Sequence, residues 1–198
     1  MRDEEIREIL QEELLSRAEN SKQKIQEEYE KNREKYILSF LNSLDKLFVK
    51  CKFMQEQKSG DKNSLGNINY IWINCMRASV ETESYKYVLR AYDETMFLCE
   101  TSAFEEYVSE YQLPMIADDK KYIESIMMKK IIRAKKYEVK DLQKWYEWNT
   151  YMKQMPREME DAIDRIANLK SYQDMKKEVD VKVCYGEMLE KQEKEYIL

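Results

Sequence analysis

The chain has 198 residues, a net charge of -5 and no histidine, and it contains only three glycines and two prolines. Without imidazole it can form neither a Ser-His or Cys-His nucleophile pair nor a histidine-bearing metal site, and its acidic balance disfavours a surface that binds nucleic acid throughout. Three glycines leave little material for a phosphate-binding loop, so the composition favours binding over catalysis.

The first predicted element is helical, because residues 1–59 contain neither glycine nor proline. Their apolar side chains recur in steps of three, four and seven or eight residues, which is the spacing of one helix face. We expect one long helix, or a pair of helices broken near Asn20 and Ser21. Residues 1–34 are highly charged and carry only a thin apolar stripe, so we predict an arm that packs on its own domain, a second copy or a partner.

A loop and a β-hairpin follow. Residues 58–67 hold two of the three glycines among other turn-forming residues, which predicts a loop. Residues 68–80 and 85–92 are rich in β-branched and aromatic side chains over short spans, which is typical of strands. We therefore predict a central antiparallel hairpin that turns between residues 81 and 84.

The predicted register of this hairpin pairs Val80 with Tyr85 and places Trp72 on the buried face. Arg77 and Arg90 then lie close together on the opposite face, where a charge is either exposed, paired or used for binding. The simpler interpretation is a structural ion pair or a solvent-facing side of the sheet. The alternative is an anion clamp made by Arg77 and Arg90, since guanidinium groups bind carboxylates through two parallel hydrogen bonds.

The pattern becomes helical again after the hairpin. Residues 96–99 could extend the sheet as a third short strand, and residues 104–111 predict a short helix that stops at Pro114. A long helix then opens at Asp118 or Asp119, since an aspartate is a good N-cap.

The C-terminal part combines a further helix with a strand. Pro156 divides the long helix from the next one, because proline fits a first turn but not a helix interior. Residues 179–185 alternate between apolar and polar side chains, which predicts a strand that joins the hairpin. The expected fold is α+β and predominantly helical, with a long N-terminal helix or helix pair, a central hairpin and three or more C-terminal helices in a single domain over residues 1–198.

The strongest local charge pattern is basic. Between Ser125 and Tyr137 the sequence has five bases and no acid. On one continuous helix, a basic stripe would be formed by Lys129, Arg133, Lys136, Lys140 and Lys144. Such a stripe could follow a phosphate backbone or dock on an acidic protein, although a solvated helix face explains the same pattern.

A second stripe of large side chains follows directly. It consists of Trp145, Trp148, Met152 and Met155. Aromatic and methionine side chains are favoured at protein interfaces, but at helical spacing they more often form core. The stripe therefore predicts either a core face or a binding surface.

Chemical sites are weakly indicated. Adjacent acids such as Asp118 and Asp119 diverge around a helix axis, so we expect them to be solvated. Four scattered cysteines without a C-x-x-C pair predict reduced thiols, and we expect no metal and no cofactor. With neither a signal sequence nor a long apolar run, the chain is expected to be cytoplasmic, with no membrane partner.

These observations favour a cytosolic protein-interaction module, such as an adaptor, an inhibitor or an immunity-type binder, that acts by occlusion and is not an enzyme. Its partner would be another protein or a second copy of the chain. The alternative is nucleic-acid binding through the stripe at residues 129–144. A second alternative is a histidine-free, metal-independent enzyme whose site is assembled from distant parts of the chain.

Overall fold

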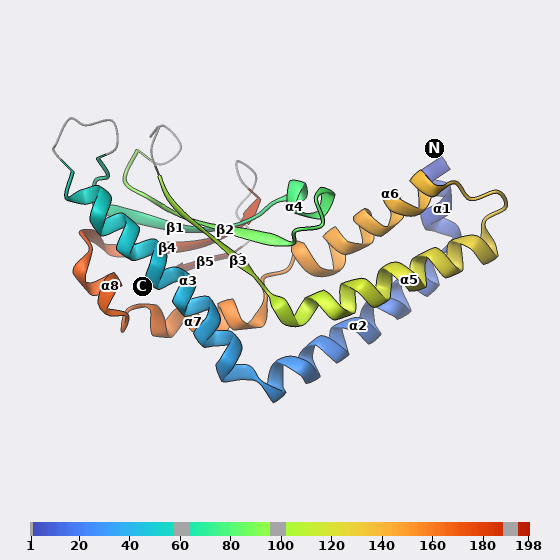
Figure 1. Cartoon of the computed structure of the whole chain (residues 1–198), viewed down its shortest axis with the longest axis horizontal. Coiled ribbons are helices and arrows are strands. Elements are labelled where there is room, and N and C mark those ends of the chain that lie inside the picture. Colours follow the sequence, from blue (N-terminus) through green and yellow to red (C-terminus); the bar gives the residue numbers. More distant parts are fainter. Residues whose placement is uncertain (1, 58–63, 96–101, 188–193) are drawn as a thin grey trace.

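The computed structural model describes residues 2–57, 64–95, 102–187 and 194–198 (Figure 1). The fold is α+β and predominantly helical, as predicted. A mixed sheet with helices packed against it forms one end of the molecule, and a layer of antiparallel helices extends away from it to the other end (Figure 1).

The described strands form one sheet in the order β3-β2-β1-β4-β5. They are β1 (Ile68–Cys75), β2 (Lys86–Tyr92), β3 (Ala103–Val108), β4 (Lys177–Glu187) and β5 (Lys194–Ile197). The pairs β1-β2, β2-β3 and β4-β5 are antiparallel, whereas β1 and β4 are parallel. The predicted C-terminal strand is thereby confirmed, and it joins the central hairpin through β1.

Three helices pack together beside the sheet, and their apolar side chains share its main core. They are α3 (Arg33–Gln55), α7 (Arg157–Ile166) and α8 (Lys170–Asp174). Phe40 of α3 meets Tyr107 of β3 edge to face, with ring centroids 5.1 Å apart. The apolar positions of α7 recur every three or four residues and are buried, so the helix predicted after Pro156 is confirmed.

The predicted hairpin register is wrong by three residues, since pairing Val80 with Tyr85 would place Cys75 opposite Arg90. Cys75 pairs with Tyr87, and the segment after β1 forms the short helix α4 (Arg77–Glu81) instead of continuing the strand. The backbone carbonyl of Ser79 closes the turn, because it accepts hydrogen bonds from the backbone amides of Ser84 and Tyr85. Side chains alternate along a strand, so this shift moves Trp72 to the opposite face of the sheet, where it pairs with Arg90.

Three further predictions for the middle of the chain fail or fall outside the described residues. Residues 104–111 form the edge strand β3 and the 3-10 helix η2 (Glu110–Gln112), because hydrogen bonding to β2 overrides the local helical pattern. Pro114 does not stop a helix but lies in the first turn of α5 (Leu113–Lys130), where no amide donor is needed. The strand expected at residues 96–99 lies outside the described part of the chain.

The N-terminal segment is a pair of long helices, preceded by a short one. α1 (Arg2–Ile9) and α2 (Gln11–Lys31) meet at Leu10, and α2 gives way to α3 at Asn32, whose φ of -131° leaves the helical region. The pair is confirmed, but its predicted break near Ser21 is wrong, because the buried Ser21 hydroxyl lies mid-helix and donates to Asp119. The predicted arm packs back: α2 contacts α5, and α1 contacts α6 (Lys136–Glu147) (Figure 1).

The long helix expected from Asp118 to Pro156 is in fact a helical hairpin. α5 ends at Lys130, a short turn contains Arg133 in the left-handed region with φ 57°, and α6 runs back antiparallel to α5 (Figure 1). Helix α6 continues into the π-helix η3 (Trp148–Met152). A left-handed residue cannot continue a right-handed helix, so the chain reverses where the sequence showed no glycine.

Candidate functional site

The predicted basic stripe is not a single surface. Lys129 ends α5, Arg133 lies in the turn, and Lys136, Lys140 and Lys144 follow along α6. Lys144 forms an ion pair with Glu81 of α4, at the end of α6 nearest the sheet. The prediction of one continuous stripe is therefore wrong, because the helix that would have aligned these side chains is broken at the turn.

The stripe of large side chains divides into core and surface. Trp148, Met152 and Met155 are buried, whereas Trp145 keeps 37% of its surface exposed. Trp145 lies in α6, whereas the buried members lie in the π-helix η3 and in the segment that follows it. Trp145 is thus the member of the predicted stripe that is available to a partner.

Trp145 lies at the edge of an apolar groove of about 350 Å³. The groove runs between the N-terminal helices and the α6-η3 segment. Its lining residues are Arg7, Glu8, Gln11, Leu14, Leu15, Ala18, Lys22, Trp145, Tyr146, Asn149 and Thr150. The Arg7 guanidinium stacks 5.1 Å from the centre of the Trp145 ring, which orients the indole, and Leu15 remains exposed on the opposite wall.

A buried carboxylate holds the two walls of the groove together. Asp119 of α5 accepts hydrogen bonds from Arg17 (2.5 Å) and Ser21 (3.0 Å) of α2 and from Tyr151 (2.6 Å) of η3. The expectation that Asp119 is solvated and caps a helix is wrong: it is fully buried in the second turn of α5. Buried carboxylates require such compensation, and here it connects α2, α5 and η3.

A second buried carboxylate connects the helical layer to the sheet. Glu158 of α7 accepts hydrogen bonds from Tyr107 of β3 (3.1 Å), from Ser109 (2.5 Å) and from Tyr111 of η2 (2.5 Å). Burial raises the pKa of Glu158, and the three hydroxyl donors oppose that rise. All three donors come from one segment, so this carboxylate anchors the passage from the edge strand into α5.

The third buried carboxylate is less well compensated. Glu147, the last residue of α6, accepts one hydrogen bond from Tyr85 (3.0 Å), and its Oε1 atom has no hydrogen-bond partner among the described residues. Burial raises the pKa of Glu147 to about 7, although Tyr85 and Lys120 act in the opposite direction. Glu147 is therefore a group of this fold that titrates near neutral pH.

The two arginines of the predicted anion clamp contact different groups. Arg77 lies in α4, donates two hydrogen bonds to Glu187 (3.1 and 3.2 Å) and stacks over Trp148. Arg90 donates to Ser102 (3.2 Å) from the middle of β2. The register that made them close neighbours on one face is wrong, and Arg77 engages a carboxylate of this same chain.

Comparisons of the sequence and of the fold with known proteins found no match. No family model, no curated protein and no solved structure matches this chain. Its function must therefore be inferred from its own geometry.

Three further properties of the described residues bear on chemistry. No three acidic or cysteine side chains are grouped as a metal ion would require within the described ranges. Cys51 and Cys184 are free and buried, and burial raises the pKa of Cys51 to about 12, so that thiol stays protonated. In the same part of the chain, no helix combines the length and apolar character needed to cross a bilayer.

Most of the groove and the burial of Asp119, Glu147 and Glu158 could not be found from the sequence. Leu15 and Arg7 lie about 130 residues from Trp145 in the chain, so no local pattern could connect them. Glu147 and Glu158 were indistinguishable from the many solvated acids, since burial of a charge depends on donors that arrive from other elements. One available signal was the abundance of tyrosine, because several hydroxyls of that residue type donate to these carboxylates.

Proposed function

We propose that this protein is a protein-interaction module whose groove between α1-α2 and α6-η3 binds a helical segment of a partner protein. The observation that carries this proposal is the exposed Trp145 beside an apolar floor. Exposed tryptophan at the edge of a desolvated pocket is the type of side chain that dominates protein interfaces. Binding of this kind would act by occlusion, without turnover.

The apolar and charged residues that line the groove indicate which kind of partner segment it binds. Its floor is apolar, and its rim carries the bases Arg7 and Lys22 against one acid, Glu8. A groove of this shape between helices accepts the apolar face of an amphipathic helix, whose side chains recur every three or four residues. Acidic residues flanking that face would complement the two bases at the rim.

The cytoplasm is the proposed compartment, with another protein as the proposed partner and a second copy of the chain as the alternative. The free and buried thiols of Cys51 and Cys184 support a reducing environment, where thiols stay unpaired. The buried carboxylates support a non-enzymatic role, because Asp119 and Glu158 accept hydrogen bonds from donors of the chain itself.

Two tryptophan variants test the groove. We expect Trp145→Ala to weaken partner binding at least about tenfold while leaving the melting temperature nearly unchanged, since its ring is partly exposed. Trp148→Ala should instead destabilise the fold by about 3 kcal/mol, because its ring is buried and leaves a cavity. The measurement is affinity capture from the native cytoplasm, followed by titration of the identified partner and by thermal melts.

Leu38→Ala provides the matched control, because Leu38 is also an exposed apolar residue but lies on α3, away from the groove. It should bind the captured partner as the original chain does. Unchanged partner affinity of Trp145→Ala would show that the groove is not the binding site. Loss of the fold in that variant would assign Trp145 to the core, and a concentration-dependent dimer would identify the partner as a second copy.

A further inference from the structure

The turn between α5 and α6 exposes apolar side chains at the far end of the molecule. Ile132 and Met128 keep 86% and 66% of their surfaces exposed, and Tyr137, five residues after Ile132, is also exposed. Exposed aliphatic side chains gathered at one place mark a contact surface more often than single scattered ones do. We call residues 128–137 the apex.

The apex is also strongly basic. It contains Lys129, Lys130, Arg133, Lys135 and Lys136 and no acid. Lys130 is paired with Glu13 of α2, and Lys135 lies over the Tyr137 ring. Lys129, Arg133 and Lys136 form no ion pair with any described residue, so their charges are available to an anionic partner.

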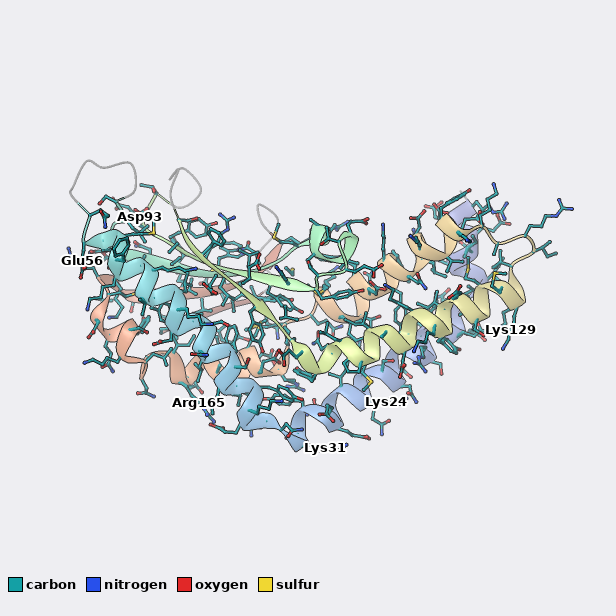
Figure 2. All side chains as sticks on the ribbon, in the orientation of Figure 1. Lys24, Lys31, Glu56, Asp93, Lys129 and Arg165 are labelled. Atoms are coloured by element: carbon teal, nitrogen blue, oxygen red, sulfur yellow. The ribbon has the colours of Figure 1, made fainter. Side chains whose placement is uncertain are left out.

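The apex lies at the end of the helical layer opposite the sheet. Figure 1 shows the α5-α6 connection as the extremity of the long axis, and Figure 2 shows Lys129 at the same end. Apolar side chains at such an extremity, flanked by bases, are able to enter the headgroup region of a bilayer.

We propose that the apex binds the surface of an anionic lipid bilayer, with Ile132 and Met128 entering the headgroup region and the surrounding bases contacting lipid phosphates. This contact is peripheral and is independent of the groove at Trp145. Cations near an anionic leaflet and shallowly inserted apolar side chains strengthen binding together.

A bilayer fits these observations better than nucleic acid does. Phosphate-backbone binding needs cations but gives Ile132 and Met128 no role, and the broken stripe no longer follows one line along a helix. α1 lies beside α6 and carries Asp3, Glu4 and Glu5, which oppose the attraction of this end to either anionic partner, so the exposed aliphatic side chains decide between them.

Vesicle sedimentation of the full chain tests the proposal. We expect binding to phosphatidylcholine vesicles that contain about one-third phosphatidylglycerol, and much weaker binding to phosphatidylcholine alone. Each basic residue near such a surface strengthens binding about fivefold, so the triple variant Lys129→Gln, Arg133→Gln, Lys136→Gln should bind about 100-fold more weakly. Ile132→Asp should also reduce binding at least about tenfold, because it removes an inserted side chain and adds a repelled charge.

Matched variants separate the apex from general charge and hydrophobicity. Lys24→Gln with Lys31→Gln removes two exposed bases of α2 (Figure 2), and Val179→Asp changes an equally exposed aliphatic residue of β4; both should leave vesicle binding unchanged. Trp145→Ala should bind vesicles normally, which keeps this test separate from the groove.

Two results would overturn the proposal. One is undetectable binding to the anionic vesicles at low salt, and the other is equal binding by the apex variants and the original chain. If single-stranded DNA or an acidic polypeptide binds at the apex while vesicles do not, the partner is that macromolecule and the lipid assignment is wrong. Thermal melts of each variant check that the fold is intact.

Discussion

Replacing Glu158 with alanine is expected to destabilise the folded chain by about 4 kcal/mol, because it leaves three buried hydroxyl groups without their shared acceptor. The side chain is completely buried, so water cannot take its place without reopening the contact between α7 and the edge of the sheet. The measurement is urea unfolding followed by circular dichroism. The shift in the urea midpoint gives the change in the free energy of unfolding, provided that its dependence on urea concentration is unchanged.

A graded series makes this prediction specific. Tyr111→Phe removes one donor and leaves the carboxylate with two, so it should cost only about 1 kcal/mol. Asp164→Ala changes an exposed acid on the same helix and should be nearly neutral. If Glu158→Ala and Asp164→Ala had the same midpoint, the cluster would not contribute to stability.

The second large effect concerns pH. Glu147 has its pKa raised from 4.5 to about 7 in the folded chain. Between those two values the folded carboxyl holds a proton that the unfolded chain has lost, so stability falls as the pH rises through this window and levels off above it. At about 1.4 kcal/mol per pKa unit, this pKa shift lowers the free energy of unfolding by about 3 kcal/mol between the acid and the alkaline side of the window.

Glu147→Gln tests this mechanism, because the amide resembles the protonated carboxyl and cannot ionise. The variant should melt at a higher temperature than the original chain near about pH 8, and at nearly the same temperature near about pH 5. Glu124→Gln changes an exposed acid of α5 and should shift neither melt relative to the original chain. If Glu147→Gln and the original chain melted at the same temperature near about pH 8, burial would not raise the pKa of the Glu147 carboxyl.

Part of the candidate site was accessible from sequence. The spacing of large side chains from Trp145 to Met155 predicts either a binding surface or a core face. In the structure Trp145 borders the groove, whereas Trp148 lies in the core. The opposite wall could not be predicted, because Leu15 and Arg7 reach Trp145 only when α1 and α2 pack back on α5 and α6. The sequence shows that the segment containing Lys129 and Arg133 is basic. It predicts one straight helix there, whereas the chain reverses and the segment forms the turn between α5 and α6.

The local patterns that failed share one physical cause. Residues 76–80 and 104–111 contain side chains compatible with either helix or strand, and hydrogen bonding to β2 or closure of the turn at Ser79 decides between them. The reversal at Arg133 is of the same kind, since a left-handed residue without glycine is tolerated where packing of α6 against α5 compensates for its strain.

The sequence by itself determined the α+β class, the helical N-terminal segment, the helix after Pro156 and the C-terminal strand, because these depend on apolar periodicity and on the fixed backbone of proline. Only the tertiary structure decided the hairpin register, the groove at Trp145, the exposed apex and the burial of Asp119, Glu147 and Glu158. A buried charge and a binding surface both depend on which elements lie opposite, and that is determined by contacts between residues far apart in the chain.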